Sequence, residues 1–174
     1  VPLIDINLNI DTFYSKRLKR TFDIFTSIAG LIMLSPIWFL LMILIKIDSK
    51  GPIFYKQERC GLNNKYFNII KFRSMIPDAE DQTGPVWAEL KDNRITMVGK
   101  LLRRLHLDET PQLINIIKGE MSLVGPRPER PYFIEKLNKE YPFYQRRLKI
   151  RPGITGWAQI KQPFDTSVKD VRQK

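Results

Sequence analysis

The chain has 174 residues, enough for one compact domain, and 43% of them are apolar, which excludes a fully disordered protein. Its 29 Lys and Arg against 18 Asp and Glu give a formal charge of +11, which attracts nucleic acid, anionic lipid or phosphorylated ligands. Cys60 and His106 are the only cysteine and histidine. This excludes an intrachain disulfide and zinc sites built from several cysteines or histidines, and it fits a reducing compartment.

The first strongly patterned segment is Ile24–Ile45, a run of 22 residues without a charge. A straight helix of about 20 apolar residues can span a bilayer. Ser35-Pro36 lies near the midpoint, where Pro36 lacks a backbone N–H and pushes Ser35 away from helical angles. We therefore expect the helix to kink or break there, with arms of roughly 10–12 residues that each reach about half of the hydrocarbon depth.

Basic residues flank this apolar run on both sides, and such residues prefer the cytoplasmic side of a membrane. A re-entrant helix-break-helix would keep both clusters on that side, whereas a spanning helix would send one across. The sequence favours the re-entrant arrangement but leaves open a proline-kinked spanning helix and a buried helix of a soluble domain. The flanking cations are Lys16, Arg17, Lys19, Arg20, Lys46, Lys50, Lys56 and Arg59.

A β-hairpin is predicted after the apolar run. Residues 52–59 and 66–73 are rich in β-branched and aromatic side chains, and the Gly-Leu-Asn-Asn stretch at 61–64 has the composition of a turn. The acidic, turn-rich residues 77–93 predict a surface loop or short helix. Trp87 within it is placed to pack on the domain, on lipid or on a second chain.

Helices dominate the remaining pattern. Apolar residues at helical spacing predict helices over 98–105 and 111–117, with Gly119 as a stop signal. Residues 132–148 predict an amphipathic helix interrupted at Pro142. The fold class expected is therefore α+β and mainly helical: a membrane hairpin, a small β-hairpin and a cytosolic helical catalytic domain.

Two adjacent carboxylates, Asp108 and Glu109, precede Pro111, which is favoured in the first turn of a helix. At such an irregular helix start both can face a cleft, where one can attack phosphorus while the other holds Mg²⁺. The alternatives are ordinary helix capping by acidic residues and a simple Arg104–Asp108 ion pair. His106, flanked by leucines, is predicted to be a helix-surface residue rather than a general base.

Cationic side chains around this pair favour the catalytic interpretation. Phosphoryl transfer depends mainly on positioning and charge neutralisation, and guanidinium groups bind phosphate in a bidentate way. Arg127 lies between two prolines, which restricts its backbone. Each arginine alone is also compatible with a solvated surface charge. The candidate phosphate-binding residues are Lys71, Arg73, Arg103, Arg127 and Arg151.

Five segments together resemble the bacterial sugar transferase family, the monotopic phosphoglycosyl transferases that initiate exopolysaccharide, capsule and O-antigen synthesis. They occur in family order and cover most of the chain from Lys16 to Ile160. Thr110 stands where the family usually has leucine, a change that fits an N-cap role. The matching segments are KRTFD (19–23), LSP (34–36), IIKFRSM (69–75), RRLHLDETPQLINIIKGEMSLVGPRPE (103–129) and RPGITGWAQI (151–160).

The resemblance implies a ping-pong reaction. Asp108 would attack the β-phosphate of a nucleoside-diphosphate sugar, with uridine as the expected nucleoside, and polyprenyl (undecaprenyl) phosphate would then accept the sugar phosphate. Glu109 would support Mg²⁺ with Asp108, and Lys71, Arg103 and Arg127 would contact substrate phosphates. The resemblance also implies a re-entrant helix broken at Ser35-Pro36, anchored at its start by Lys19, Arg20 and Asp23.

This interpretation divides the chain into a linker (1–15), a re-entrant hairpin (16–50) and a catalytic domain (51–174), with further sequence expected at both ends. The catalytic domain is expected on the cytoplasmic face of the bacterial inner membrane. The missing N-terminal region and the loop at Trp87 could supply contacts for a homodimer.

Two other functions compete with the transferase. A non-catalytic membrane adapter would tolerate loss of Asp108 and Glu109. A nucleic-acid binder would suit the charge, but the chain has no nucleic-acid-binding motif and the apolar run has no role there, so we expect no nucleic-acid partner.

Overall fold

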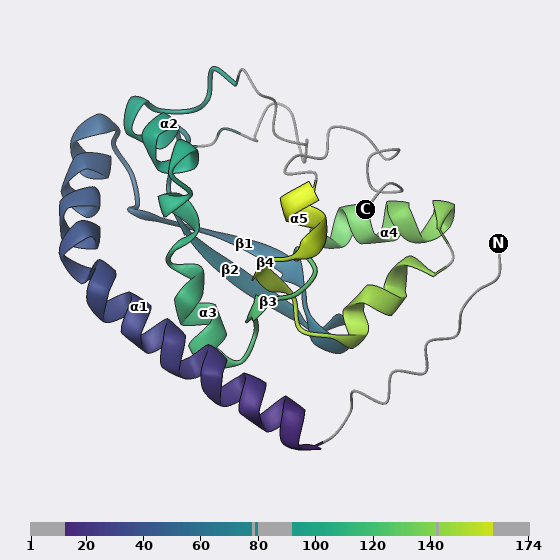
Figure 1. Cartoon of the computed structure of the whole chain (residues 1–174). Coiled ribbons are helices and arrows are strands. Elements are labelled where there is room, and N and C mark those ends of the chain that lie inside the picture. The colour runs from purple at the N-terminus through teal and green to yellow at the C-terminus, as the bar shows by residue number, and fades with distance from the viewer. Residues whose placement is uncertain (1–12, 78, 80–91, 142, 162–174) are drawn as a thin grey trace.

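The computed structural model describes residues 13–77, 79, 92–141 and 143–161. The expected linker up to residue 12 and the loop at Trp87 lie outside the described residues, as does the break expected at Pro142. The described part mixes helices with strands, as the α+β class predicted, and the strands form two small sheets. Figure 1 shows a long helix along one side of the molecule, with the sheets in the middle.

The long helix is α1 (Phe13–Asp48), and it continues through Pro36. Pro36 cannot donate to the carbonyl of Ile32, and the Ser35 hydroxyl donates to that carbonyl instead, at 2.8 Å. The sequence predicted a kink or a break at Ser35 and Pro36, and the helix is not broken there, because a side chain replaces the missing backbone donor. The helix changes direction along its length, so its two arms are not collinear (Figure 1).

Most of the apolar surface of α1 is not covered by the rest of the described chain. Phe25 and Met33 are 74% and 77% exposed, and Arg17–Asp48 is long and apolar enough to cross a membrane. A helix buried inside a soluble domain would not show this exposure. Length and composition leave the re-entrant and spanning arrangements open.

Two sets of contacts attach α1 to the rest of the protein. Near its start, Asp23 is buried and accepts hydrogen bonds from the Ser122 hydroxyl at 2.8 Å and the Leu123 N–H at 3.2 Å. Lys19 donates to the Ser122 hydroxyl and to the carbonyl of Val124. Near its end, buried Leu41 and Ile45 pack with Phe72 and Leu102, far along the sequence.

The predicted β-hairpin is confirmed. Strands β1 (Phe54–Cys60) and β2 (Tyr66–Phe72) pair antiparallel, with Phe54 opposite Phe72 and Cys60 opposite Tyr66. The connecting turn, Leu62–Asn64, places Asn63 and Asn64 at positive φ, which asparagine tolerates better than most residues.

The helices after the hairpin hold the predicted carboxylate pair between them. Helix α2 (Met97–Arg104) begins at Thr96, whose hydroxyl accepts from the Gly99 N–H, and α3 (Gln112–Lys118) ends at Gly119 with φ +89°. A three-residue helical turn, η2 (Leu107–Glu109), lies between them. Helix α3 runs beside α1 (Figure 1), and buried Ile116 packs against Phe67 and Ile69 of the hairpin.

A short parallel pair of strands, β3 (Ser122–Val124) and β4 (Gly153–Thr155), was not predicted. Between them lie α4 (Pro131–Glu140) and the helical turn η3 (Tyr144–Lys149), in the range 132–148 where an interrupted amphipathic helix was expected. The described chain closes with α5 (Trp157–Lys161). A Cβ on Gly153 would lie 2.1 Å from the backbone nitrogen of Gly125, so these segments approach closer than any side chain would allow.

Candidate active site

The adjacent carboxylates Asp108 and Glu109 lie in the turn η2, between two packed helices. His106 precedes this turn at φ 54°, in a left-handed conformation, and its side chain is exposed. His106 therefore lies at the corner between the two helices. Within the described part of the chain, its side chain forms no hydrogen bond with either carboxylate. The predicted surface position of His106 is confirmed.

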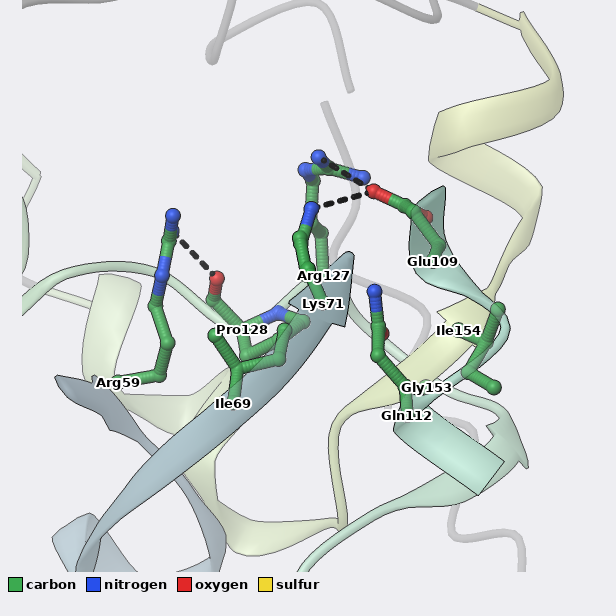
Figure 2. Close-up of a pocket in the computed structure, with 9 residues that line it drawn as sticks. All are labelled: Arg59, Ile69, Lys71, Glu109, Gln112, Arg127, Pro128, Gly153 and Ile154. Atoms are coloured by element: carbon green, nitrogen blue, oxygen red, sulfur yellow. Dashed lines mark hydrogen bonds and ion pairs between the residues drawn. The ribbon is translucent and has the colours of Figure 1, made fainter. Parts of the chain in front are cut away.

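Glu109 is the centre of a charged cluster that joins three separate parts of the chain. Its Oε1 lies 2.6 Å from Lys71 Nζ of β2 and 3.3 Å from a terminal nitrogen of Arg127, and Figure 2 shows both cations directed at this oxygen. Burial alone would raise the pKa of the carboxyl, but the charges and hydrogen bonds of the two cations outweigh burial and hold the pKa of Glu109 at about 2. Glu109 is therefore ionised at neutral pH.

Asp108 has the opposite electrostatic balance. Asp108 is only 8% exposed, and this burial raises the pKa of its carboxyl above the ordinary value. The positive charge of Lys71 acts in the opposite direction but does not cancel the effect of burial. The negative charge of Glu109 raises the pKa further, and Arg103 opposes it. The turn thus holds two neighbouring carboxylates with pKa values shifted in opposite directions, a pattern that is common where two acids take different roles.

The two alternative interpretations of the carboxylate pair, helix capping and an ion pair between Arg104 and Asp108, are not supported by the structure. Among the described residues no Arg104–Asp108 ion pair is formed, and Arg104 is exposed. Helix α3 is capped at Pro111 without a side-chain bond. The expectation that Thr110 acts as an N-cap is therefore wrong, since its hydroxyl donates to the carbonyl of Leu107 at 2.8 Å.

Thr110 also connects this turn to the apolar helix. The indole N–H of Trp38 in α1 donates to the Thr110 hydroxyl at 3.0 Å. The Trp38 ring meets Phe54 and Phe72 of the hairpin edge-on, with centroids at 6.4 and 5.3 Å. The carboxylate pair is consequently held against the C-terminal arm of α1.

The predicted phosphate-binding residues separate into two groups. Lys71 and Arg127 contact Glu109, and Arg103 lies close enough to influence Asp108 while its Nε donates to the Ser74 hydroxyl at 2.9 Å. Arg73 and Arg151 are placed elsewhere. The residues that the structure brings together are therefore Lys71, Arg103, Asp108, Glu109 and Arg127.

Arg73 closes the C-terminal end of α1 instead of joining the cluster. Its guanidinium is buried and donates to the carbonyl of Ser49 at 2.6 Å, to the Ser49 hydroxyl at 2.9 Å and to the carbonyl of Lys50 at 3.1 Å. Ser49 and Lys50 directly follow the last residue of α1, so this cation satisfies backbone oxygens of the segment in which the chain leaves the helix. The structure gives no support to Arg73 as a phosphate ligand.

Arg151 serves the end of another helix. Its Nε donates to the carbonyl of Gly119 at 3.0 Å, beside Arg20, whose guanidinium donates to the carbonyls of Ile116 and Ile117 at 2.6 and 3.0 Å. Both arginines thus complete the C-terminal turn of α3. This placement separates Arg151 from the Glu109 cluster and does not support its predicted role there.

A small pocket opens beside the Glu109 cluster, and it contains residues that the sequence analysis did not single out. Arg59 donates to the carbonyl of Pro128 at 3.0 Å, and burial lowers its pKa to about 10. Gln112 is only 2% exposed and follows the carboxylate pair within the same motif, which was the available signal for it. The lining residues are Arg59, Ile69, Lys71, Glu109, Gln112, Arg127, Pro128, Gly153 and Ile154 (Figure 2).

The donor set fits Mg²⁺ better than a metal that needs a full set of protein ligands. The described residues contain no group of three or more His, Cys, Asp or Glu side chains that could hold a metal. Mg²⁺ is commonly held by one or two carboxylates, with water and substrate phosphates completing its shell. Asp108 and ionised Glu109 can supply that number of ligands.

The chain is similar to known proteins over most of its length. The model of the family described as bacterial sugar transferase matches residues 14–173. The chain is 43% identical over 157 residues to a UDP-N-acetylgalactosamine-undecaprenyl-phosphate N-acetylgalactosaminephosphotransferase of Aeromonas hydrophila, with 90% of this chain and 37% of that protein covered.

Two further relatives extend the comparison. A UDP-glucose:undecaprenyl-phosphate glucose-1-phosphate transferase of Escherichia coli (strain K12) is 40% identical over 160 residues, with 92% of this chain and 34% of that protein covered. The exopolysaccharide production protein PSS of Rhizobium leguminosarum bv. phaseoli is 43% identical over 150 residues, with 83% and 74% covered. The chain thus spans about a third of the two longer relatives. Because the family model covers nearly all of it, the chain belongs to the bacterial sugar transferase family.

Proposed function

We propose that this protein transfers a sugar 1-phosphate from a nucleoside-diphosphate sugar to undecaprenyl phosphate. The observation that carries the proposal is the buried Asp108 beside Glu109, with Lys71 and Arg127 converging on the latter. Relatives named as undecaprenyl-phosphate sugar phosphotransferases support the substrate class, and two of those names specify UDP-sugars. The step would initiate assembly of an exopolysaccharide, capsule or O-antigen.

In the first half-reaction, a carboxylate oxygen of Asp108 attacks the β-phosphorus of the donor. The bond from this phosphorus to the bridging oxygen breaks, and the nucleoside monophosphate leaves with the electron pair. The product is an acyl phosphate that carries the sugar on Asp108. Burial favours this role, because a carboxylate with a raised pKa is a stronger base than one in water.

In the second half-reaction, a phosphate oxygen of undecaprenyl phosphate attacks the same phosphorus. The bond to the Asp108 oxygen breaks, which releases the lipid diphosphate sugar and restores the carboxylate. The Lys71 ammonium and the Arg127 guanidinium stabilise the negative charge on the phosphoryl oxygens in both steps. Arg103, beside Asp108, is the third cation placed for this task.

Glu109 and Asp108 would hold Mg²⁺, which would neutralise part of the diphosphate charge when bound. The ionised state of Glu109 at neutral pH suits a metal ligand. Removal of divalent cations by a chelator is therefore expected to stop turnover, and added Mg²⁺ to restore it.

The lipid substrate requires the site to lie at a membrane surface. The exposed apolar face of α1 and the Trp38–Thr110 contact support this placement, because they join the carboxylate turn to the segment most suited to lipid. We propose that α1 enters and leaves the inner membrane on the cytoplasmic side, which keeps the basic residues before and after it on one face.

The decisive experiment compares the wild type with Asp108→Asn in membranes that contain undecaprenyl phosphate, Mg²⁺ and a panel of sugar nucleotides. We expect the wild type to release nucleoside monophosphate and Asp108→Asn to lose at least about 10³-fold in rate, since the nucleophile is absent. A phosphosugar adduct mapped to Asp108 by mass spectrometry would support the covalent step.

Asp48→Asn is a matched control, because Asp48 lies outside the carboxylate turn and accepts a hydrogen bond from the Val98 N–H at the start of α2, which asparagine can also accept. It should retain near wild-type turnover. Release of nucleoside diphosphate would indicate a conventional glycosyl transferase, and full activity of Asp108→Asn would favour a non-catalytic adapter instead.

A further inference from the structure

The side-chain amide of Gln112 is buried without a partner for its nitrogen. Gln112 is the first residue of α3 and is only 2% exposed, yet its Nε2 makes no hydrogen bond to any residue that the structure describes. Figure 2 shows this nitrogen directed toward the space between Lys71 and Glu109. Buried amide donors in folded proteins are nearly always paired, because desolvation without a partner is unfavourable.

The same helix satisfies another buried amide completely. The Asn115 nitrogen donates to the carbonyl of Asn68 at 2.8 Å and to a carboxylate oxygen of Glu120 at 2.6 Å, and its oxygen accepts from the Ile70 N–H at 3.0 Å. Asn115 is a structural amide that links α3 to β2. Gln112 has the same functional group and the same degree of burial but points into the pocket.

The surroundings of Gln112 define the kind of ligand that would accept its hydrogen bond. Arg59, Lys71 and Arg127 line the pocket, and Glu109 is the only carboxylate among the lining residues. This excess of positive charge favours an anion. A phosphoryl oxygen carries negative charge, accepts hydrogen bonds from several donors at once, and matches nitrogens that reach it from different directions.

We infer that Gln112 is a substrate-binding residue whose Nε2 donates to a non-bridging phosphoryl oxygen of the diphosphate donor. The inference rests on the proposed function and adds to it a neutral donor beside the cations. A cation here would add to the positive charge that Lys71 and Arg127 already bring together. An amide instead contributes a directional bond, because its N–H can point at one oxygen only.

The test uses Gln112→Met in membrane preparations of the protein, because methionine keeps the length of the side chain and removes the donor. Loss of a hydrogen bond to a charged group is expected to lower kcat/KM for the sugar nucleotide by about 10- to 100-fold, measured as nucleoside monophosphate release. The thermal midpoint of the ligand-free protein should stay the same or rise, because an unpaired buried donor has been removed.

Two further variants separate binding from structure. Gln112→Glu keeps the shape of the side chain but brings negative charge toward the phosphate, so kcat/KM should fall further than in Gln112→Met. Asn115→Leu removes an amide that is fully paired within the protein, so its thermal midpoint should fall, in contrast to that of Gln112→Met.

Wild-type kcat/KM in Gln112→Met would overturn the inference while leaving the proposed function intact. A fall in thermal midpoint as large as that of Asn115→Leu would also overturn it, because Gln112 would then be structural. If the wild type released no nucleoside monophosphate from any sugar nucleotide, the proposed function would fail, and this inference with it.

Discussion

Two sets of cationic side chains in this protein look alike in sequence but bind different kinds of partner. Arg20, Arg73 and Arg151 donate to backbone carbonyls at the C-terminal ends of α1 and α3. Lys71 and Arg127 instead converge on one oxygen of Glu109. The first set is committed to the fold, because its donors complete helices. The second set pairs with a carboxylate at a pocket, where an incoming phosphate can share the cations.

The contrast is sharpest between Lys71 and Arg73, which are two residues apart. Lys71 lies within β2 and faces the carboxylate turn, whereas Arg73 follows the strand and turns to the end of α1. A count of basic residues therefore does not locate a phosphate site. The partner of each side chain separates the two sets, since a carbonyl fixes a guanidinium in the fold and an ionised carboxylate marks a place that tolerates charge.

The largest expected effect comes from exchanging these two neighbours for methionine. Lys71→Met removes a cation from the site and should lower kcat/KM by about 10²- to 10³-fold, as loss of one preorganised donor does in other enzymes. Arg73→Met should leave the rate per folded molecule close to wild type but lower the free energy of unfolding by about 2–3 kcal/mol, because several carbonyls lose their donor. Nucleotide release and thermal unfolding in detergent measure the two effects.

The comparison between the two sets would break if Arg73→Met lost activity without losing stability. That result would place Arg73 in the site despite its bonds to Ser49 and Lys50. Equal losses of stability in both variants would show that Lys71 is mainly structural.

A smaller effect is expected on stability: neutralising Asp108 and neutralising Glu109 should shift the thermal midpoint in opposite directions. Burial raises the pKa of Asp108, so its charge opposes folding at neutral pH, and Asp108→Asn should raise the thermal midpoint. The pKa of Glu109 lies below its ordinary value of 4.5, so its charge stabilises the fold, and Glu109→Gln should lower the midpoint. Each kcal/mol corresponds to roughly 2–4 °C for a chain of this size.

The effect of pH provides the control for this pair. The stability contributed by Glu109 is fully present above pH 4.5 and is lost as the pH falls toward about 2. The penalty from Asp108 also disappears in acid, because the neutral carboxyl carries no charge to desolvate. The two variants should therefore differ clearly at pH 7 and much less at pH 3. A difference that persists unchanged at pH 3 would contradict the electrostatic account.

The smallest effect concerns the contact between α1 and the carboxylate turn. Thr110→Val keeps the shape of the side chain and removes both hydrogen bonds of its hydroxyl, so we expect a loss of about 1 kcal/mol in the free energy of unfolding. Thr110→Ser should recover it. In a double-mutant cycle with Trp38→Phe, the double variant should lose less stability than the sum of the two single variants, because both changes remove the same hydrogen bond. Full additivity would show that the two groups do not interact.

Much of the molecule followed from local patterns. The β-branched and aromatic residues on either side of the turn at Gly61 predicted the hairpin, and Gly119 marked the end of α3. The order of the motifs predicted that Asp108, Glu109, Lys71 and Arg127 share one site, and the structure brings these residues together. These features depend on neighbours in sequence or on a family pattern.

What sequence could not predict depends on partners far along the chain. Arg73 and Arg151 were assigned to phosphate because nothing local reveals which carbonyls they reach. Strands β3 and β4 have three residues each, too few to show a period, and they pair only because Gly125 and Gly153 allow close approach. Ser35 preserved the helix by donating to Ile32, an option that a rule about the residue before proline does not include.

The bond between Trp38 and Thr110 gives the protein a built-in optical reporter. Indole emission responds to the polarity and hydrogen bonding around the ring, and this ring lies between the apolar helix and the turn that carries Asp108. The chain has three tryptophans, so replacing Trp87 and Trp157 with phenylalanine would leave a single fluorophore at this junction. Occupancy of the site and insertion of the helix into lipid could then be followed through the emission of one native side chain, without a dye.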